Sequence, residues 1–86
     1  MKPSVQKLQV DHSLDIRRCQ RAEGYQQAKA KLHDMTEDQI LELYLDEGDA
    51  LNSIPFALRA EGHEIVVSEP VKEGVRLLVR KRTLLA

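Results

Sequence analysis

The strongest local signal in the chain is a fourteen-residue stretch that runs Leu51-Asn52-Ser53-Ile54-Pro55-Phe56-Ala57-Leu58-Arg59-Ala60-Glu61-Gly62-His63-Glu64. Leu51, Ile54 and Leu58 recur at spacings of three and four, so they lie on one face of a predicted helix. Gly62 comes next, and glycine readily adopts the left-handed conformation that ends a helix. The β-branched residues directly after it indicate a strand. The stretch therefore predicts a helix, a glycine cap and a strand.

The start of this helix is indicated by Pro55, which has no backbone N–H. Proline is accommodated best in the first turn of a helix, where that group has no partner. Asp49, Asn52 and Ser53 each carry a side-chain oxygen that can cap the free N–H groups of a first turn. We therefore expect the helix to begin shortly before Pro55.

Three patterns upstream of this stretch predict further elements. Apolar and polar residues alternate over residues 8–16, as in a half-buried strand. Apolar residues then recur at helical spacing over residues 22–35. Leu41, Leu43 and Leu45 alternate with polar residues, which predicts a second strand.

Downstream, the apolar run after the glycine cap predicts a third strand over residues 63–68. Residues 69–74 contain a proline and a glycine placed as turn formers, so they predict a hairpin connection. Val75, Leu77 and Val79 then alternate with arginines, which predicts a fourth strand.

The predicted order of elements is therefore β-α-β-α-β-β. Each element has one apolar face, so we expect an α/β two-layer sandwich in which two helices cover one face of a four-stranded mixed sheet. Residues 1–86 form a single domain, because a chain this short holds one modest core. The side chains expected to be buried are Leu41, Leu43, Leu45, Ile54, Leu58, Val67 and Leu77.

The charges balance overall but are unevenly distributed along the chain. Fourteen acids face 13 bases in total. Residues 1–33 carry seven bases and three acids, whereas residues 34–49 carry seven acids and no base. The overall balance argues against a bulk polyelectrolyte partner.

The single cysteine, Cys19, cannot form a disulfide within the chain, and the N-terminus lacks the apolar run of a signal peptide. No apolar run approaches the roughly 20 residues that a membrane helix requires. We therefore expect a soluble protein in the reducing cytoplasm.

Several short motifs resemble the TusA/SirA family of small sulfur-carrier proteins, and the resemblance covers most of the chain. Members of that family have Leu-Asp at the first strand, Cys-Pro-x-Pro at the start of the first helix, a strand that ends in acidic residues, Ile-Pro with a nearby Phe, Gly-His-Glu, and a last strand that ends in Arg-Lys. This chain has, in the same order, Leu14-Asp15, Asp46-Glu47, Ile54-Pro55-Phe56, Gly62-His63-Glu64 and Val79-Arg80-Lys81.

The resemblance implies a function in sulfur transfer. In the family, the motif cysteine accepts persulfide sulfur from a donor such as a cysteine desulfurase and passes it to an acceptor protein. An ungapped match from Leu14-Asp15 to Ile54-Pro55 places Arg21-Ala22-Glu23-Gly24 at the motif, without its cysteine or prolines. Cys19 lies two residues upstream of the expected position. It is the chain's only candidate for a sulfurtransferase-like catalytic residue.

Persulfide transfer requires a thiolate, and the thiol of a free cysteine is mostly protonated at neutral pH. Arg17, Arg18 and Arg21 flank Cys19, and neighbouring cations favour the anion. Asp15 is a candidate for capping or orienting the loop before the first helix. The alternative interpretation is that Cys19 is a small structural residue within a solvated basic turn.

Other classes of site have less support. The arginines have no aromatic residues among them, which argues against binding of single-stranded nucleic acid. The three histidines, His12, His33 and His63, lack metal-ligand spacing, and no nucleotide-binding loop is present, so we expect no metal or cofactor. The alternative function is a non-catalytic module of the same fold that binds a protein partner and lacks the sulfur-transfer motif.

Overall fold

The computed structural model describes residues 9–83, except for the side chains of Arg21, Asp49 and Ala50. Two helices and four strands follow one another in the predicted order. They are β1 (His12–Asp15), α1 (Arg21–Asp34), β2 (Ile40–Leu45), α2 (Asp49–Ala60), β3 (Glu64–Val71) and β4 (Gly74–Arg80).

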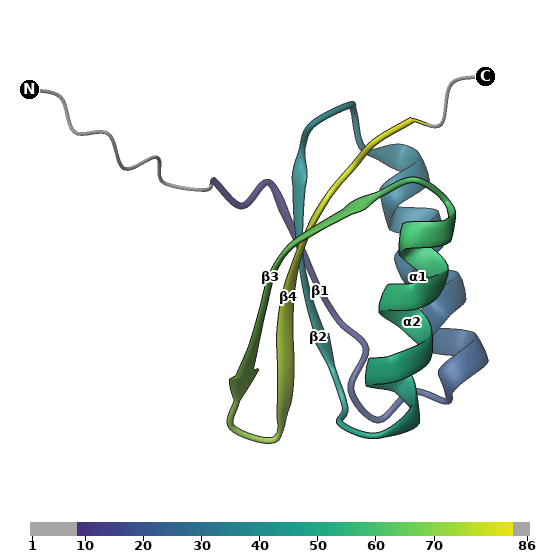
Figure 1. Ribbon diagram of the computed structural model, residues 1–86, viewed down its shortest axis with the longest axis vertical. Helices are drawn as coiled ribbons and strands as arrows, with labels where there is room; N and C mark the ends of the chain where they lie inside the picture. The colour runs from purple at the N-terminus through teal and green to yellow at the C-terminus, as the bar shows by residue number, and fades with distance from the viewer. Residues whose placement is uncertain (1–8, 84–86) are drawn as a thin grey trace, which may run out of the picture.

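The strands form one mixed sheet in the order β1-β2-β4-β3. β1 and β2 are parallel and are joined through α1, whereas β4 runs antiparallel to both β2 and β3. Both helices pack on the same face of the sheet (Figure 1). The expected two-layer α/β sandwich is therefore confirmed.

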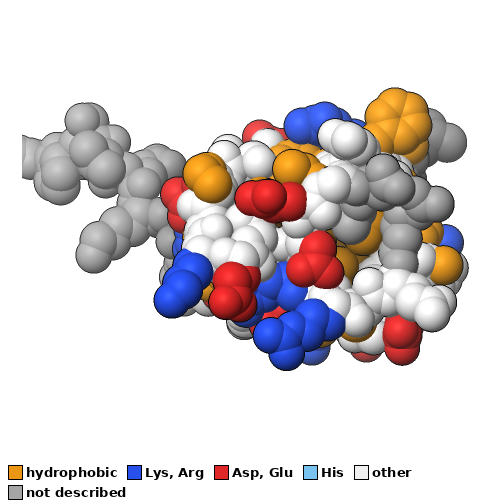
Figure 2. Space-filling model, turned by 90° about the horizontal axis from the view of Figure 1, so that it is seen from below, with side chains coloured by type: hydrophobic (Ala, Val, Ile, Leu, Met, Phe, Trp, Pro, Cys, Tyr) orange, Lys and Arg blue, Asp and Glu red, His pale blue; other side chains and the backbone are white. Residues whose placement is uncertain are grey.

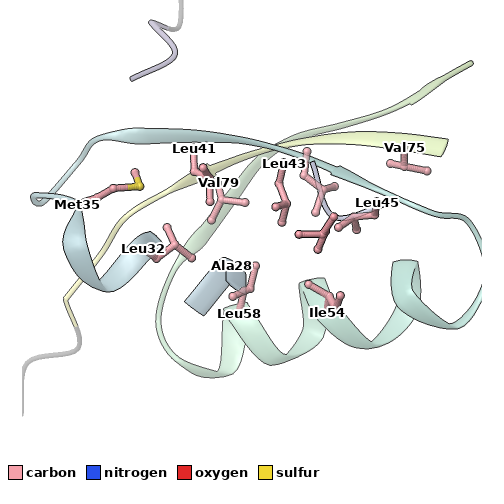
Figure 3. Close-up of a cluster of buried hydrophobic side chains, with 12 residues drawn as sticks. Ala28, Leu32, Met35, Leu41, Leu43, Leu45, Ile54, Leu58, Val75 and Val79 are labelled. Atoms are coloured by element: carbon pink, nitrogen blue, oxygen red, sulfur yellow. The ribbon is translucent and has the colours of Figure 1, made fainter. Parts of the chain in front are cut away.

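The core lies between the central strands and the helices (Figure 3). The three leucines of β2 are completely buried, because the alternation of the strand turns all of them toward the helices. α1 and α2 each contribute an apolar stripe to the same layer. The largest fully buried side chains are Leu32, Leu41, Leu43, Leu45, Ile54, Leu58, Leu77 and Val79.

The opposite face of the sheet carries charged side chains. Arg76 in β4 donates from Nε to Glu42 in β2 and from Nη1 to Glu69 in β3, both at 2.7 Å. Glu42 also accepts a hydrogen bond of 3.0 Å from Ser13 in β1. The hydrogen bonds from Arg76 are the main reason that the pKa of Glu42 is lowered. This row of contacts crosses all four strands.

The C-terminus of α2 has the predicted glycine cap. Gly62 has a φ of +101°, its N–H donates to Arg59 O, and the N–H of His63 donates to Leu58 O. These two bonds form a Schellman motif, which satisfies carbonyl groups at the end of the helix. The predicted cap is confirmed.

The predicted start of α2 is wrong. The helix begins at Asp49, so Pro55 lies inside it rather than in its first turn. The N-cap residue is Gly48, which has a φ of +95° and no side chain to cap the N–H groups. The apolar spacing from Leu51 onward outweighs the local preference of the proline, because Pro55 is buried with the helix face.

Two strand boundaries differ from the prediction. β1 covers His12–Asp15 rather than residues 8–16; Leu8 lies outside the described residues. β3 extends to Val71, so the predicted connection over residues 69–74 shortens to the two residues between Val71 and Gly74. Pro70 fits within β3 because an edge strand tolerates a missing N–H.

Val67 is only partly buried, contrary to expectation. A register shift lies between Ile65 and Val67, so that Ile65 pairs with Val79 but Val67 pairs with Leu78. Val79 belongs to the core under the helices, and Leu78 is on the other face of β4. The irregularity in β3 therefore turns Val67 away from the helices.

Replacing Leu43 tests the assignment of the core. Leu43→Ala removes a fully buried side chain and should lower the free energy of unfolding by about 2–5 kcal/mol. The matched control is Val67→Ala, which truncates a partly buried side chain and should cost clearly less. Urea unfolding of both variants measures the difference. Equal losses would contradict the assignment of Leu43 and Val67 to different faces.

Candidate functional site

The candidate site is the loop between β1 and α1, which contains Cys19. The loop lies at the end of the molecule where β2 enters α2 and β3 turns into β4 (Figure 1). Ile16 begins the loop, and its N–H donates to Tyr44 O at 2.9 Å, which extends the pairing with β2. Its side chain is buried in the core. The start of the loop is thereby fixed to the sheet.

Arg18 gives the loop its sharp turn. Its φ is +73°, a left-handed conformation that is strained for a residue with a side chain. Its N–H donates to Asp46 Oδ2 at 2.7 Å, a charge-assisted bond from the loop that precedes α2. Asp46 therefore holds the β1–α1 loop in its turned conformation.

Cys19 is partly buried and packs against the core. Its Sγ lies 3.7 Å from Nε2 of Gln27, a residue in the second turn of α1. Gly24 is also adjacent, because a Cβ placed on it would lie 3.7 Å from the Cys19 Cβ. The N-cap of α1 is Gln20, one residue beyond the cysteine. The thiol therefore lies alongside the start of the helix.

Arg17 is bound to Asp15. Its backbone N–H and its Nε both donate to Asp15 Oδ1 at 3.0 Å, and its Nη2 donates to Oδ2 at 2.7 Å. These bonds lower the pKa of Asp15 to about 2. The guanidinium also lies over the ring of Tyr44, 5.1 Å from its centroid. Arg17 is thus directed to the charged face of the sheet.

A hollow of about 430 Å³ lies beside this loop, and its lining is charged. Figure 2 views this end of the molecule and shows acidic and basic side chains interleaved. Three carboxylates and two guanidinium groups line the hollow. The lining residues, hereafter the charged hollow, are Asp15, Arg17, Arg18, Asp46 and Glu73.

The structure brings together only part of the predicted site. Asp15, Arg17 and Arg18 share the charged hollow, and the Arg21 side chain lies outside the described part. Cys19 does not line that hollow. Among the side-chain hydrogen bonds and ion pairs of the described residues, the thiol contacts only Gln27.

Sequence reasoning did not assign Asp46, Glu73 or Gln27 to the site. Asp46 and Glu73 are distant from the β1–α1 loop in sequence and are brought beside Arg17 and Arg18 by the tertiary fold. The only signal for Asp46 was its place in the acidic pair after the second strand.

Within residues 9–83, no group of three or more histidine, cysteine, aspartate or glutamate side chains is placed to hold a metal ion. In the same range, no helix has the length and apolar character needed to cross a membrane.

Comparison with known protein families and with curated proteins identifies no relative of this chain. No model of a known protein family matches the chain. No curated protein matches it either.

Replacing Asp46 tests its role in holding the loop. Asp46→Ala removes the acceptor of the Arg18 N–H and should lower the free energy of unfolding by about 1–2 kcal/mol. Asp46→Asn keeps an acceptor oxygen and should cost less. Adding Arg18→Gly to Asp46→Ala should restore part of the loss, because glycine adopts a positive φ freely. An unchanged urea midpoint in Asp46→Ala would contradict this role.

Proposed function

We propose that the protein is a small TusA-like sulfur carrier in which Cys19 holds persulfide sulfur between a donor and an acceptor protein. The observation that supports this proposal is the position of the thiol: it is partly exposed, in the loop that enters the first helix of a β-α-β-α-β-β sandwich. The TusA/SirA resemblance implies a carrier cysteine at the start of that helix. Cys19 lies two residues before the motif position, in the loop that leads directly into it.

The transfer itself needs no redox partner. The Cys19 thiol gives up its proton to solvent, and the thiolate attacks the terminal sulfur of a persulfide on the donor, such as a cysteine desulfurase. A bond forms between Cys19 Sγ and that sulfur, while the sulfur–sulfur bond of the donor breaks and its cysteine leaves as a thiolate. A nucleophile on the acceptor protein then removes the terminal sulfur and releases the Cys19 thiolate.

The charged hollow supplies the docking surface in this proposal. A donor must bring its persulfide, and an acceptor its nucleophile, to the β1–α1 loop, and the acidic and basic side chains of the hollow adjoin that loop. Complementary charges steer association and select partners. A carrier with a single free thiol functions in a reducing compartment, so we place the protein in the cytoplasm.

The second candidate is a non-catalytic module of the same fold that binds a protein partner. One observation favours it: Cys19 is packed against the core and Gln27, while Arg17 is bound to Asp15 rather than to the thiol. In this alternative the charged hollow binds a partner and the thiol has only a packing role.

Mass spectrometry of the intact protein tests the proposed function. After incubation with a cysteine desulfurase and cysteine, the wild-type chain should gain one sulfur atom, which a reducing agent removes. Cys19→Ser should gain none, because no other residue in the chain carries a thiol. Native-state alkylation with iodoacetamide checks that the thiol is reachable.

The result that would overturn the carrier is a wild-type chain that gains no sulfur from several desulfurases while its folded state remains intact. A thiol that reacts with iodoacetamide only after unfolding in urea would have the same meaning. Either outcome would leave the partner-binding module as the function.

A further inference from the structure

His63 lies at the opposite end of the sheet from the candidate site, at the corner between α2 and β3. Its backbone N–H completes the Schellman motif, which fixes the position of the residue. Its ring is partly buried, and Nδ1 accepts a hydrogen bond of 3.1 Å from the backbone N–H of Arg82. An imidazole accepts at Nδ1 only when that nitrogen carries no proton. The contact therefore requires neutral His63.

Arg82 belongs to the segment Lys81–Thr83, which follows β4 and is attached to three other parts of the fold. Lys81 exchanges backbone hydrogen bonds of 2.8 Å with Asp38 and Gln39 in the connection between α1 and β2. The N–H of Thr83 donates to Glu37 Oε1, also at 2.8 Å. The contact with His63 is the hydrogen bond that ties this segment to the α2–β3 corner.

The Lys81 side chain joins the same segment to α1. Its Nζ donates to Leu32 O at 2.6 Å, so a positive charge lies at the C-terminus of the helix. Between α1, the α2–β3 corner and Lys81–Thr83 lies a hollow of about 420 Å³, hereafter the latch hollow. Its lining includes His63, Lys81 and Arg82.

Charged groups face His63 from every neighbouring element. Glu61 at the end of α2 and Glu37 in the α1–β2 connection favour its protonated form, and Lys81 opposes it. Lys29, His33 and Asp34 of α1 and Arg82 line the same hollow. Burial outweighs the carboxylates and lowers the pKa of His63 below its ordinary value.

We propose that His63 is a pH-sensitive latch that holds the segment Lys81–Thr83 against the α2–β3 corner and releases it on protonation. A proton on Nδ1 replaces the acceptor with a donor, so the Arg82 N–H loses its partner. The bonds from Lys81 to the α1–β2 connection do not involve His63 and stay in place. The Arg82 guanidinium also stays paired with Glu37 and Asp38. Lys81 Nζ stays bonded to Leu32 O. Protonation therefore releases the segment from the α2–β3 corner only.

The direction of the pH effect follows from the lowered pKa. Neutral His63 is favoured in the folded protein, so the contribution of the latch to stability is complete above the ordinary histidine pKa of about 6.5. That contribution is lost as the pH falls below this value and through the folded pKa. Glu37, whose pKa is lowered from 4.5, stays ionised in this range and keeps its bond to Thr83.

Amide hydrogen exchange of the full chain, measured by NMR, tests the latch. As the pH falls from 7.5 through the pKa of His63, which its ring resonances report in the same titration, the protection of the Arg82 amide should fall by about three- to tenfold relative to the Lys81 amide, which is the effect of one lost hydrogen bond. The Lys81 amide is the internal reference, because it is bonded to Gln39 O and to no titratable group.

Two variants separate the latch from general effects of pH. His63→Asn places an oxygen near the position of Nδ1 but does not titrate, so the protection of Arg82 should remain and its pH dependence should disappear. His33→Asn removes another histidine of the same hollow and should behave as the wild type. If the relative protection of Arg82 does not change with pH in the wild type, or still changes in His63→Asn, the latch is overturned.

Discussion

The alternation of β2 is the constraint on which the rest of the structure depends. Leu41, Leu43 and Leu45 point to one face and are completely buried beneath both helices. Glu42 and Tyr44 therefore point to the other face, where they meet arginines from β4 and from the β1–α1 loop. A one-residue slip of this central strand would exchange the two sets, placing the Glu42 carboxylate and Tyr44 in the core and the leucines in water.

Much of the fold could be predicted from the sequence because its elements are strongly periodic. The order of elements and the buried leucines follow from spacing, and the cap follows from the conformational freedom of Gly62. The errors arose where pairing between strands decided the outcome. The irregularity at Ile65/Val67 and the extension of β3 through Pro70 both depend on the register against β4, which no local pattern in β3 encodes. The start of α2 was missed because burial of its apolar face outweighed the preference of Pro55.

The candidate site was less predictable than the fold, for a related reason. The sequence showed arginines beside Cys19, and closeness in sequence suggested that they would act on the thiol. In the structure, Arg17 and the thiol diverge at the left-handed turn of Arg18: Arg17 is directed to Asp15, and the thiol packs along α1. The residue that stabilises this turn, Asp46, comes from another loop. Whether Arg17 can act on its sequence neighbour Cys19 therefore depends on the φ angle of Arg18.

The two outer strands of the sheet have a consequence for association between copies of the chain. An exposed edge with free N–H and C=O groups is a template for joining sheets, and long straight edges promote aggregation. Here one edge, β1, is only four residues long, and the other, β3, contains an irregularity and a proline that has no N–H to donate. Both edges are poor templates for a further strand. The domain is thereby suited to high local concentration, including covalent fusion to a second copy, without growth of the sheet from one copy into the next.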